Sequence, residues 1–144
     1  MCEQTLAQTE PVAEQTQPRP TVLIVDDDAD QNEVLCHRLG GQGFNTLSAQ
    51  TGGQGRDVAR EQHPDLILLD LRLPDANGMD VCQQLSDDPA TCDIPVIILS
   101  GLADGDIVRC CRAAGCQFYV RKPYDPNALL TLVRQAIAES QAWE

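Results

Sequence analysis

Acidic side chains stand at the ends of apolar runs in this sequence. Asp26, Asp27 and Asp28 follow the apolar residues 22–25, and Asp70 follows the apolar residues 66–69. Neighbouring carboxylates repel one another unless a cation or solvent relieves the repulsion. The pattern therefore indicates either a solvated surface turn or a site for a positively charged ligand.

Two other apolar runs end near polar groups that complement a cluster of acids. Ser100 follows residues 96–99, and Lys122 lies two residues beyond the run 118–120. The carboxyl ends of parallel strands meet at one edge of a sheet, so these groups converge if the runs are parallel strands. Carboxylate oxygens suit Mg²⁺, with Mn²⁺ as an alternative, while Lys122 and Ser100 would hold a negatively charged group.

Short apolar runs alternate with longer helical patterns from residue 21 onward. The predicted strands are residues 22–25, 46–49, 66–69, 96–99 and 118–120, and the predicted helices are residues 29–39, 53–62, 79–86, 103–114 and 126–142. This alternation predicts an α/β fold with a parallel sheet covered on both faces. The first, third and fourth runs are continuously apolar and thus central, which favours the doubly wound order 2-1-3-4-5.

Helix-start signals support several of these boundaries. Asp125 before Pro126 predicts an N-cap followed by proline at the first helical position. Asp75, Asn77 and Gly78 are typical of a turn and the start of a helix. We interpret these three residues as structural.

Composition limits the domain organisation and the classes of partner. The chain has 144 residues and a formal net charge of -12 with 10 basic residues, which argues for one domain and against nucleic acid or anionic lipid as a partner. No apolar run approaches the roughly 18 residues of a membrane span, and residues 1–20 lack the features of a secretory signal. We therefore expect a cytoplasmic protein with a disordered polar tail at residues 1–20 and a domain at residues 21–142.

The 7 cysteines do not favour a zinc or disulfide framework, because their number is odd and none form a Cys-x-x-Cys pair. Ile107, Cys110, Cys111 and Ala114 share one helical face, which predicts that these thiols serve as small core side chains rather than as an oxidation switch. His37 lies in the middle of the first predicted helix and His63 in the turn His63-Pro64-Asp65, away from the strand ends that carry the acids. We expect structural or solvent-exposed roles for both histidines.

Four motifs in order, VDDD (25–28), LLDLRLPDANG (68–78), ILSG (98–101) and YVRKPY (119–124), resemble those of bacterial response-regulator receiver domains, the stand-alone chemotaxis type included. The resemblance covers residues 21–142. It implies a flavodoxin-like receiver fold that accepts a phosphoryl group from a sensor histidine kinase or a histidine phosphotransfer protein. It also implies a signalling domain rather than an enzyme, one that assists its own phosphorylation and dephosphorylation.

The resemblance implies a metal site built from four residues. Asp27 would bind Mg²⁺ directly, Asp26 largely through water, and the phosphoacceptor Asp70 and the backbone carbonyl of Arg72 would complete the set. Asp28 matches a variable family position, so a solvated or helix-capping role is preferred for it.

The resemblance also implies the phosphoryl chemistry and its readout. Asp70 would accept the phosphoryl group, Ser100 would hold one of its oxygens, and Lys122 would pair with its charge. Ser100 and Tyr119 would form the switch, and the family takes a cis peptide bond before Pro123. The signal would leave through the face formed by helix 103–114, strand 118–120 and helix 126–142, toward a downstream protein or a second copy of the chain.

Two alternatives from other functional classes stay open. A Mg²⁺-dependent phosphohydrolase would also use a strand-end aspartate, but such enzymes usually need a second acid two residues later, where this chain has Arg72. A receiver-like binding module independent of phosphorylation would generally lose part of the acid, Ser and Lys set, and this chain keeps all of it.

Overall fold

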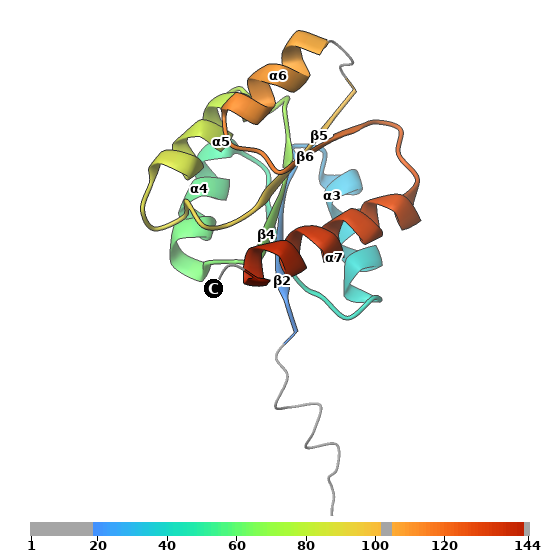
Figure 1. Ribbon diagram of the computed structural model, residues 1–144. Coiled ribbons are helices and arrows are strands. Elements are labelled where there is room, and N and C mark those ends of the chain that lie inside the picture. The colour runs from blue at the N-terminus through green and yellow to red at the C-terminus, as the bar shows by residue number, and fades with distance from the viewer. Residues whose placement is uncertain (1–18, 102–104, 143–144) are drawn as a thin grey trace, which may run out of the picture.

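A computed structural model of the chain describes residues 19–101 and 105–142 (Figure 1). Most of the predicted polar tail, residues 1–18, lies outside the described residues. In the described residues, strands and helices alternate in the order that the sequence predicted. They are β2 Thr21–Val25, α3 Ala29–Gly40, β3 Asn45–Ala49, α4 Gly52–Gln62, β4 Leu66–Asp70, α5 Gly78–Asp87, β5 Val96–Ser100, α6 Gly105–Ala113, β6 Phe118–Arg121 and α7 Pro126–Ala142.

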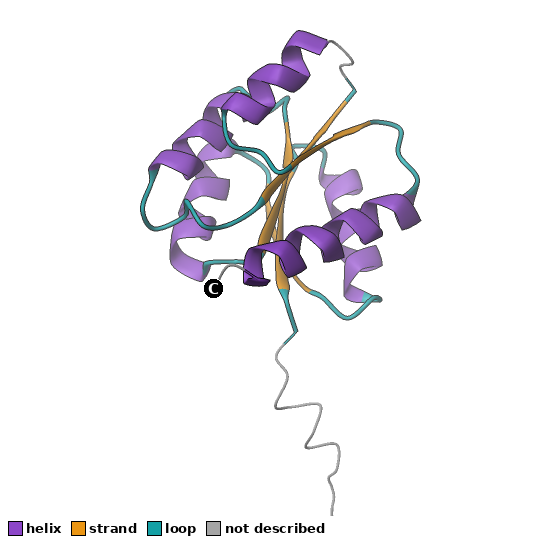
Figure 2. Cartoon of the chain, viewed as in Figure 1, coloured by secondary structure: helices purple, strands orange, loops and turns teal. Residues whose placement is uncertain are grey.

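The strands form one parallel sheet in the order β3-β2-β4-β5-β6, which confirms the predicted doubly wound topology. All residues of β5 are buried, as are four of the five in β2 and in β4, whereas β3 and β6 are largely half-buried or exposed. Continuous apolar runs became central strands because both of their faces are covered. Figure 2 shows the twisted sheet between two groups of helices.

Alternate residues of each strand feed two separate cores. In β2, Leu23 and Val25 pack into a cluster with residues of α4, α5 and α6, while Val22 and Ile24 pack with residues of α3 and α7. The helices accordingly lie in two layers, α3 and α7 on one face of the sheet and α4, α5 and α6 on the other (Figure 1). This period of two fixes which strand residues can reach each face.

The helix starts agree with the capping signals. The backbone amide of Asn127 donates to Asp125 Oδ1 at 3.0 Å, and α7 begins at Pro126, as predicted. The described part of α6 spans Gly105–Ala113, and its predicted start at residue 103 lies outside the described residues. None of the described helices is long and apolar enough to cross a bilayer.

The cysteine prediction is correct in part. Cys82, Cys111 and Cys116 are buried in the core beneath α5 and α6, but Cys110 is exposed, so its predicted place on the core face is wrong. The buried stripe of α6 is narrower than the sequence pattern implied, and Cys110 lies at its edge. Burial raises the pKa of Cys82 to about 12 and that of Cys111 to about 11, so both thiols are protonated and unreactive at neutral pH.

Candidate functional site

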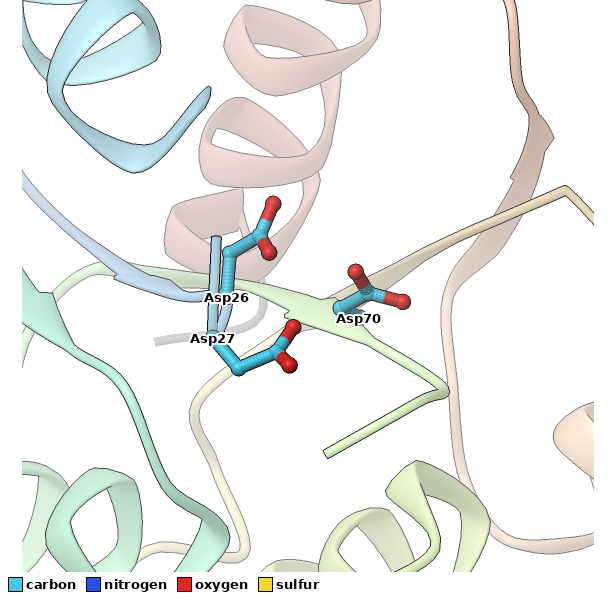
Figure 3. A group of neighbouring side chains, drawn as sticks. All are labelled: Asp26, Asp27 and Asp70. Atoms are coloured by element: carbon cyan, nitrogen blue, oxygen red, sulfur yellow. The ribbon is translucent and has the colours of Figure 1, made fainter. Parts of the chain in front are cut away.

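The acids at the ends of β2 and β4 meet at one edge of the sheet. Val25 is paired with Leu69, so the residues that follow, Asp26 and Asp70, come side by side. Carboxylate oxygens of Asp26, Asp27 and Asp70 lie within 4.8 Å of one another (Figure 3). Asp26 is buried, Asp70 is half-buried and Asp27 is exposed. The predicted convergence of these three side chains is confirmed.

Lys122 provides the positive charge beside the acids. Its Nζ lies 3.1 Å from Asp70 Oδ2 and 3.7 Å from Asp26 Oδ2, and it donates to Gln31 Oε1 at 3.4 Å. Burial alone would lower the pKa of Lys122, but the hydrogen bond and charge of Asp70, together with Asp26, outweigh it, and the pKa is raised. The Lys122–Pro123 peptide bond is cis, as the family resemblance implied. Lys122 is therefore held as a cation directly against the phosphoacceptor candidate.

Asp26 is the member of the acidic cluster whose ionised form is least favoured. Asp26 is 7% exposed, and this burial raises its pKa. The negative charges of Asp70 and Asp27 also raise it. The backbone amide of Asp28, which donates to Asp26 Oδ1 at 3.0 Å, and the charge of Lys122 oppose the rise without cancelling it. Burial and the neighbouring carboxylates thus disfavour the ionised form of Asp26, and a further cation at the cluster would favour it.

The segment after Asp70 lies against its carboxylate. The backbone amide of Arg72 donates to Asp70 Oδ1 at 3.1 Å, and Arg72 forms an antiparallel bridge with Asn77. The Arg72 side chain is exposed, so it is the backbone of this residue that lies near the cluster. Participation of the Arg72 carbonyl in metal binding stays a prediction.

Ser100 and Tyr119 lie on neighbouring strands. Ser100 ends β5 and is 1% exposed, and Tyr119 in β6 is paired with Ile98, two residues earlier in β5. Residues two apart in a strand face the same side of a sheet, so Ser100 and the half-buried Tyr119 share one face. The switch role of this pair stays a prediction.

The sequence did not indicate the buried side chain of Asn32, which hydrogen-bonds to the backbone at the ends of β2 and β3 beside the cluster. Its Nδ2 donates to the carbonyl oxygens of Ala49 at 3.0 Å, Asp26 at 3.1 Å and Ile24 at 3.3 Å, while its Oδ1 accepts from Ser48 Oγ at 2.9 Å. Asn32 shares a helical face with Leu35 and Leu39, which are also buried. That spacing was the signal that could have identified it.

The remaining candidate residues have structural contacts. Asp28 is the N-cap of α3, with its side chain accepting from the amides of Asp30 and Gln31, as preferred from the sequence. Asn77 caps α5, which begins at Gly78, also as expected. His63 pairs with Asp93 at 3.1 Å, and neither His37 nor His63 belongs to the acidic cluster in the described part of the chain.

An open cleft adjoins the cluster. It has a volume of about 540 Å³ and runs between α3 and the segment after β6, with Asp26 and Lys122 in its wall. Most of its lining is apolar and includes Leu35, Leu99 and Val34, and Val34 is 56% exposed. The cleft thus places an apolar surface next to the charged groups.

Residues 22–134 match the family described as "Response regulator receiver domain". The chain belongs to this family. It is a receiver domain of two-component systems, a class of signalling domains that interact with histidine kinases and downstream targets and generally bind Mg²⁺ at an acidic pocket.

Relatives of this receiver domain differ in length. The chain is 40% identical over 116 residues to the DNA-binding response regulator MtrA of Mycolicibacterium paratuberculosis, covering 81% of the chain but 50% of MtrA, so it spans about half the length of that relative. It is 32% identical over 121 residues to the polar-differentiation response regulator DivK of Brucella ovis, covering 83% of the chain and 98% of DivK.

A solved receiver structure shows the same architecture. The response regulator receiver domain protein (CheY-like) from Methanospirillum hungatei superimposes with a TM-score of 0.83 at 25% identity, over 88% of this chain and 99% of the other. This likeness confirms the flavodoxin-like receiver fold predicted from the motifs.

Proposed function

We propose that this receiver domain accepts a phosphoryl group on Asp70 in a Mg²⁺-dependent reaction and signals by a conformational change. The observation that carries the proposal is the meeting of Asp26, Asp27 and Asp70 within 4.8 Å, with Lys122 Nζ at 3.1 Å from Asp70. A carboxylate nucleophile, a fixed ammonium and a metal site are the groups that phosphoryl transfer to an aspartate requires.

The donor set fits a hard divalent cation. Three carboxylates of graded burial supply oxygen ligands. Burial raises the pKa of Asp26, with smaller contributions from the charges of Asp70 and Asp27, and a bound cation would favour its ionised form. We propose Asp26, Asp27, Asp70 and the carbonyl of Arg72 as the residues that hold Mg²⁺ or Mn²⁺. When bound, the ion would neutralise charge on the transferring phosphoryl oxygens.

The phosphoryl group would come from a phosphohistidine. An Asp70 carboxylate oxygen attacks phosphorus, the new O–P bond forms as the P–N bond breaks, and the electron pair stays on the imidazole nitrogen. Lys122 and the hydroxyl of Ser100 would hold the phosphoryl oxygens. The amide of Arg72, 3.1 Å from Asp70 Oδ1, keeps the nucleophile oriented.

The donor would be a sensor histidine kinase or a histidine phosphotransfer protein. The cleft beside α3, with exposed Val34 and the acceptor-side Lys122 both in its wall, is the surface on which we expect the donor to dock. The output would go to a downstream protein or a second copy of the chain. MtrA is named as DNA-binding, and an attached output of that kind is one destination for the signal.

Intact mass measurement with acetyl phosphate and Mg²⁺ tests the phosphoacceptor. The parent should gain one phosphoryl group, and Asp70→Asn should gain none. Asp28→Asn is the matched control, since asparagine also caps helices and Asp28 lies outside the metal cluster. An equal gain of mass by Asp70→Asn would mean that Asp70 is wrongly assigned.

A second assay, phosphate release from p-nitrophenyl phosphate, is combined with the mass measurement to separate the two alternative functions. A phosphohydrolase would release phosphate continuously from p-nitrophenyl phosphate without a labelled protein, and a phosphorylation-independent binding module would do neither. The exposed Arg72 at the second position after Asp70 provides no acid for the hydrolase reaction. For this reason the receiver function is preferred.

The proposed switch is tested with beryllofluoride and Mg²⁺, which mimic the phosphorylated aspartate. Ser100 and Tyr119 share a face of β5 and β6, so a hydroxyl drawn toward the phosphoryl oxygens would free space for the Tyr119 ring. Amide NMR shifts should then extend to α6, β6 and the start of α7. Shifts restricted to the loops around Asp27 and Asp70 would contradict this route.

A further inference from the structure

The loop that follows Asp70 is closed at its base. The backbone amide of Gly78 donates to the carbonyl of Leu71 at 2.8 Å, and Arg72 bridges Asn77. A Cβ atom on Gly78 would lie 2.4 Å from the carbonyl oxygen of Asp70, so α5 begins in direct contact with the phosphoacceptor backbone. Residues 73–76 therefore form a tight loop whose two ends, Arg72 and Asn77, lie side by side.

The tip of this loop is tied to a different element. Asp75 Oδ1 accepts the backbone amide of Gly52 at 2.8 Å, and Asp75 Oδ2 accepts that of Gly53 at 3.0 Å. Thr51 Oγ1 accepts the amide of Gln54 at 3.0 Å. The first amides of a helix have no partner within it, so Asp75 and Thr51 together satisfy three amides at the start of α4.

The contact between the Asp75 carboxylate and the start of α4 is close and favours the ionised form of Asp75. A Cβ atom on Gly52 would lie 2.8 Å from Val81 Cγ2 in α5 and 3.4 Å from Asp75 Oδ1, so the start of α4 packs closely against both α5 and the loop. The amides of Gly53 and Gly52 lower the pKa of Asp75, and the charge of Arg56 adds to this effect. Asp75 is thus ionised at neutral pH and aligned with the positive end of the α4 dipole.

We propose that Asp75 is a positioning residue for the metal site: by anchoring the loop to the start of α4, it holds the Arg72 backbone where its carbonyl can bind Mg²⁺. The inference rests on the proposed function and assigns a role to Asp75 that turn formation alone does not require. Mg²⁺ tolerates little departure from octahedral geometry, so a displaced carbonyl lowers affinity.

The test measures Mg²⁺ dissociation constants by calorimetry for the parent, Asp75→Ala, Asp75→Asn and Thr51→Ala. Thr51→Ala is the matched control, because it removes a capping acceptor from the same helix end without touching the loop after Asp70. Asp75→Ala should weaken Mg²⁺ binding by about tenfold, the lower end of the range for outer-shell partners of metal ligands. Asp75→Asn, which keeps one acceptor oxygen, should fall between it and the parent.

Urea midpoints and amide NMR spectra of the metal-free proteins complete the test. Both alanine variants should unfold at lower urea concentrations, but only the Asp75 variants should shift the Arg72 amide. If Thr51→Ala weakens Mg²⁺ binding as much as Asp75→Ala, or if Asp75→Ala leaves the dissociation constant unchanged, Asp75 is only a helix cap. Absence of Mg²⁺ binding by the parent would overturn the proposed function and this inference together.

Discussion

Replacing Asn32 with alanine should destabilise the fold through the groups it leaves without partners. The amide nitrogen has two N–H donors for its three carbonyl contacts, so it makes about two full hydrogen bonds, and its oxygen accepts a third from Ser48. The carbonyl of Ala49 would keep the backbone amide of Asp26 at 3.0 Å. The Asn32 side chain would no longer accept from the Ser48 hydroxyl and the Cys36 thiol, or donate to the carbonyls of Asp26 and Ile24.

The expected loss follows from these contacts. A lost hydrogen bond removes about 1 kcal/mol of net stability, and a buried group left unpaired costs about 1–3 kcal/mol. The higher helix propensity of alanine offsets roughly 0.5 kcal/mol of this loss in the free energy of unfolding. We therefore expect Asn32→Ala to lower the free energy of unfolding by about 2–4 kcal/mol.

Urea unfolding followed by far-UV circular dichroism at pH 7 without added metal measures this loss. Asn127→Ala is the control, because it makes the same replacement at an exposed position in α7 and should change stability by no more than about 0.5 kcal/mol. Equal losses for the two variants would refute the idea that the Asn32 amide supports the ends of β2 and β3.

Two further predictions use the same unfolding assay. The raised pKa of Asp26 means that its ionisation opposes folding, so Asp26→Asn should be more stable than the parent at pH 7 without metal. This difference in stability should shrink as the pH falls toward 4, because Asp26 becomes protonated in the parent. A variant less stable than the parent at pH 7 would contradict this explanation. Gly78→Ala should lose about 1–3 kcal/mol because its methyl group would strike the Asp70 backbone. Gly40→Ala, with nothing within 4 Å, is the control, and an equal change in both would reject this packing argument.

The fold was predictable where one strong local pattern decided it. The runs in β2, β4 and β5 are apolar without interruption, and that pattern places a strand at the centre of a parallel sheet. The second helix, α4, was harder, because its glycines have low helix propensity. Gly55 occurs there because a Cβ atom would lie 2.9 Å from Val25 Cγ2, and Gly52 is needed against Val81. Such contacts are decided by packing between distant segments.

The candidate site divides in the same way. Asp26, Asp70 and Lys122 could be placed from the sequence because strand ends in a parallel sheet meet at one edge. The contacts of Asn32 and Asp75 could not, since each joins segments that only the tertiary structure brings together: Asn32 reaches Ala49, and Asp75 reaches the start of α4. Positioning residues of this kind carry little local signal.

The charge balance of the cluster suggests where the proposed signal would start. Three carboxylates face one ammonium, so the metal-free cluster has an excess of negative charge. Under the proposed function, a divalent cation would neutralise this excess negative charge. Phosphorylation would then raise the negative charge at residue 70 from one to about two and place it on the phosphoryl oxygens. Lys122 would follow that charge away from its present position 3.1 Å from Asp70 Oδ2. Because the backbone amide of Lys122 donates to the carbonyl of Ser100 at 2.7 Å, the proposed movement would begin where β5 and β6 meet.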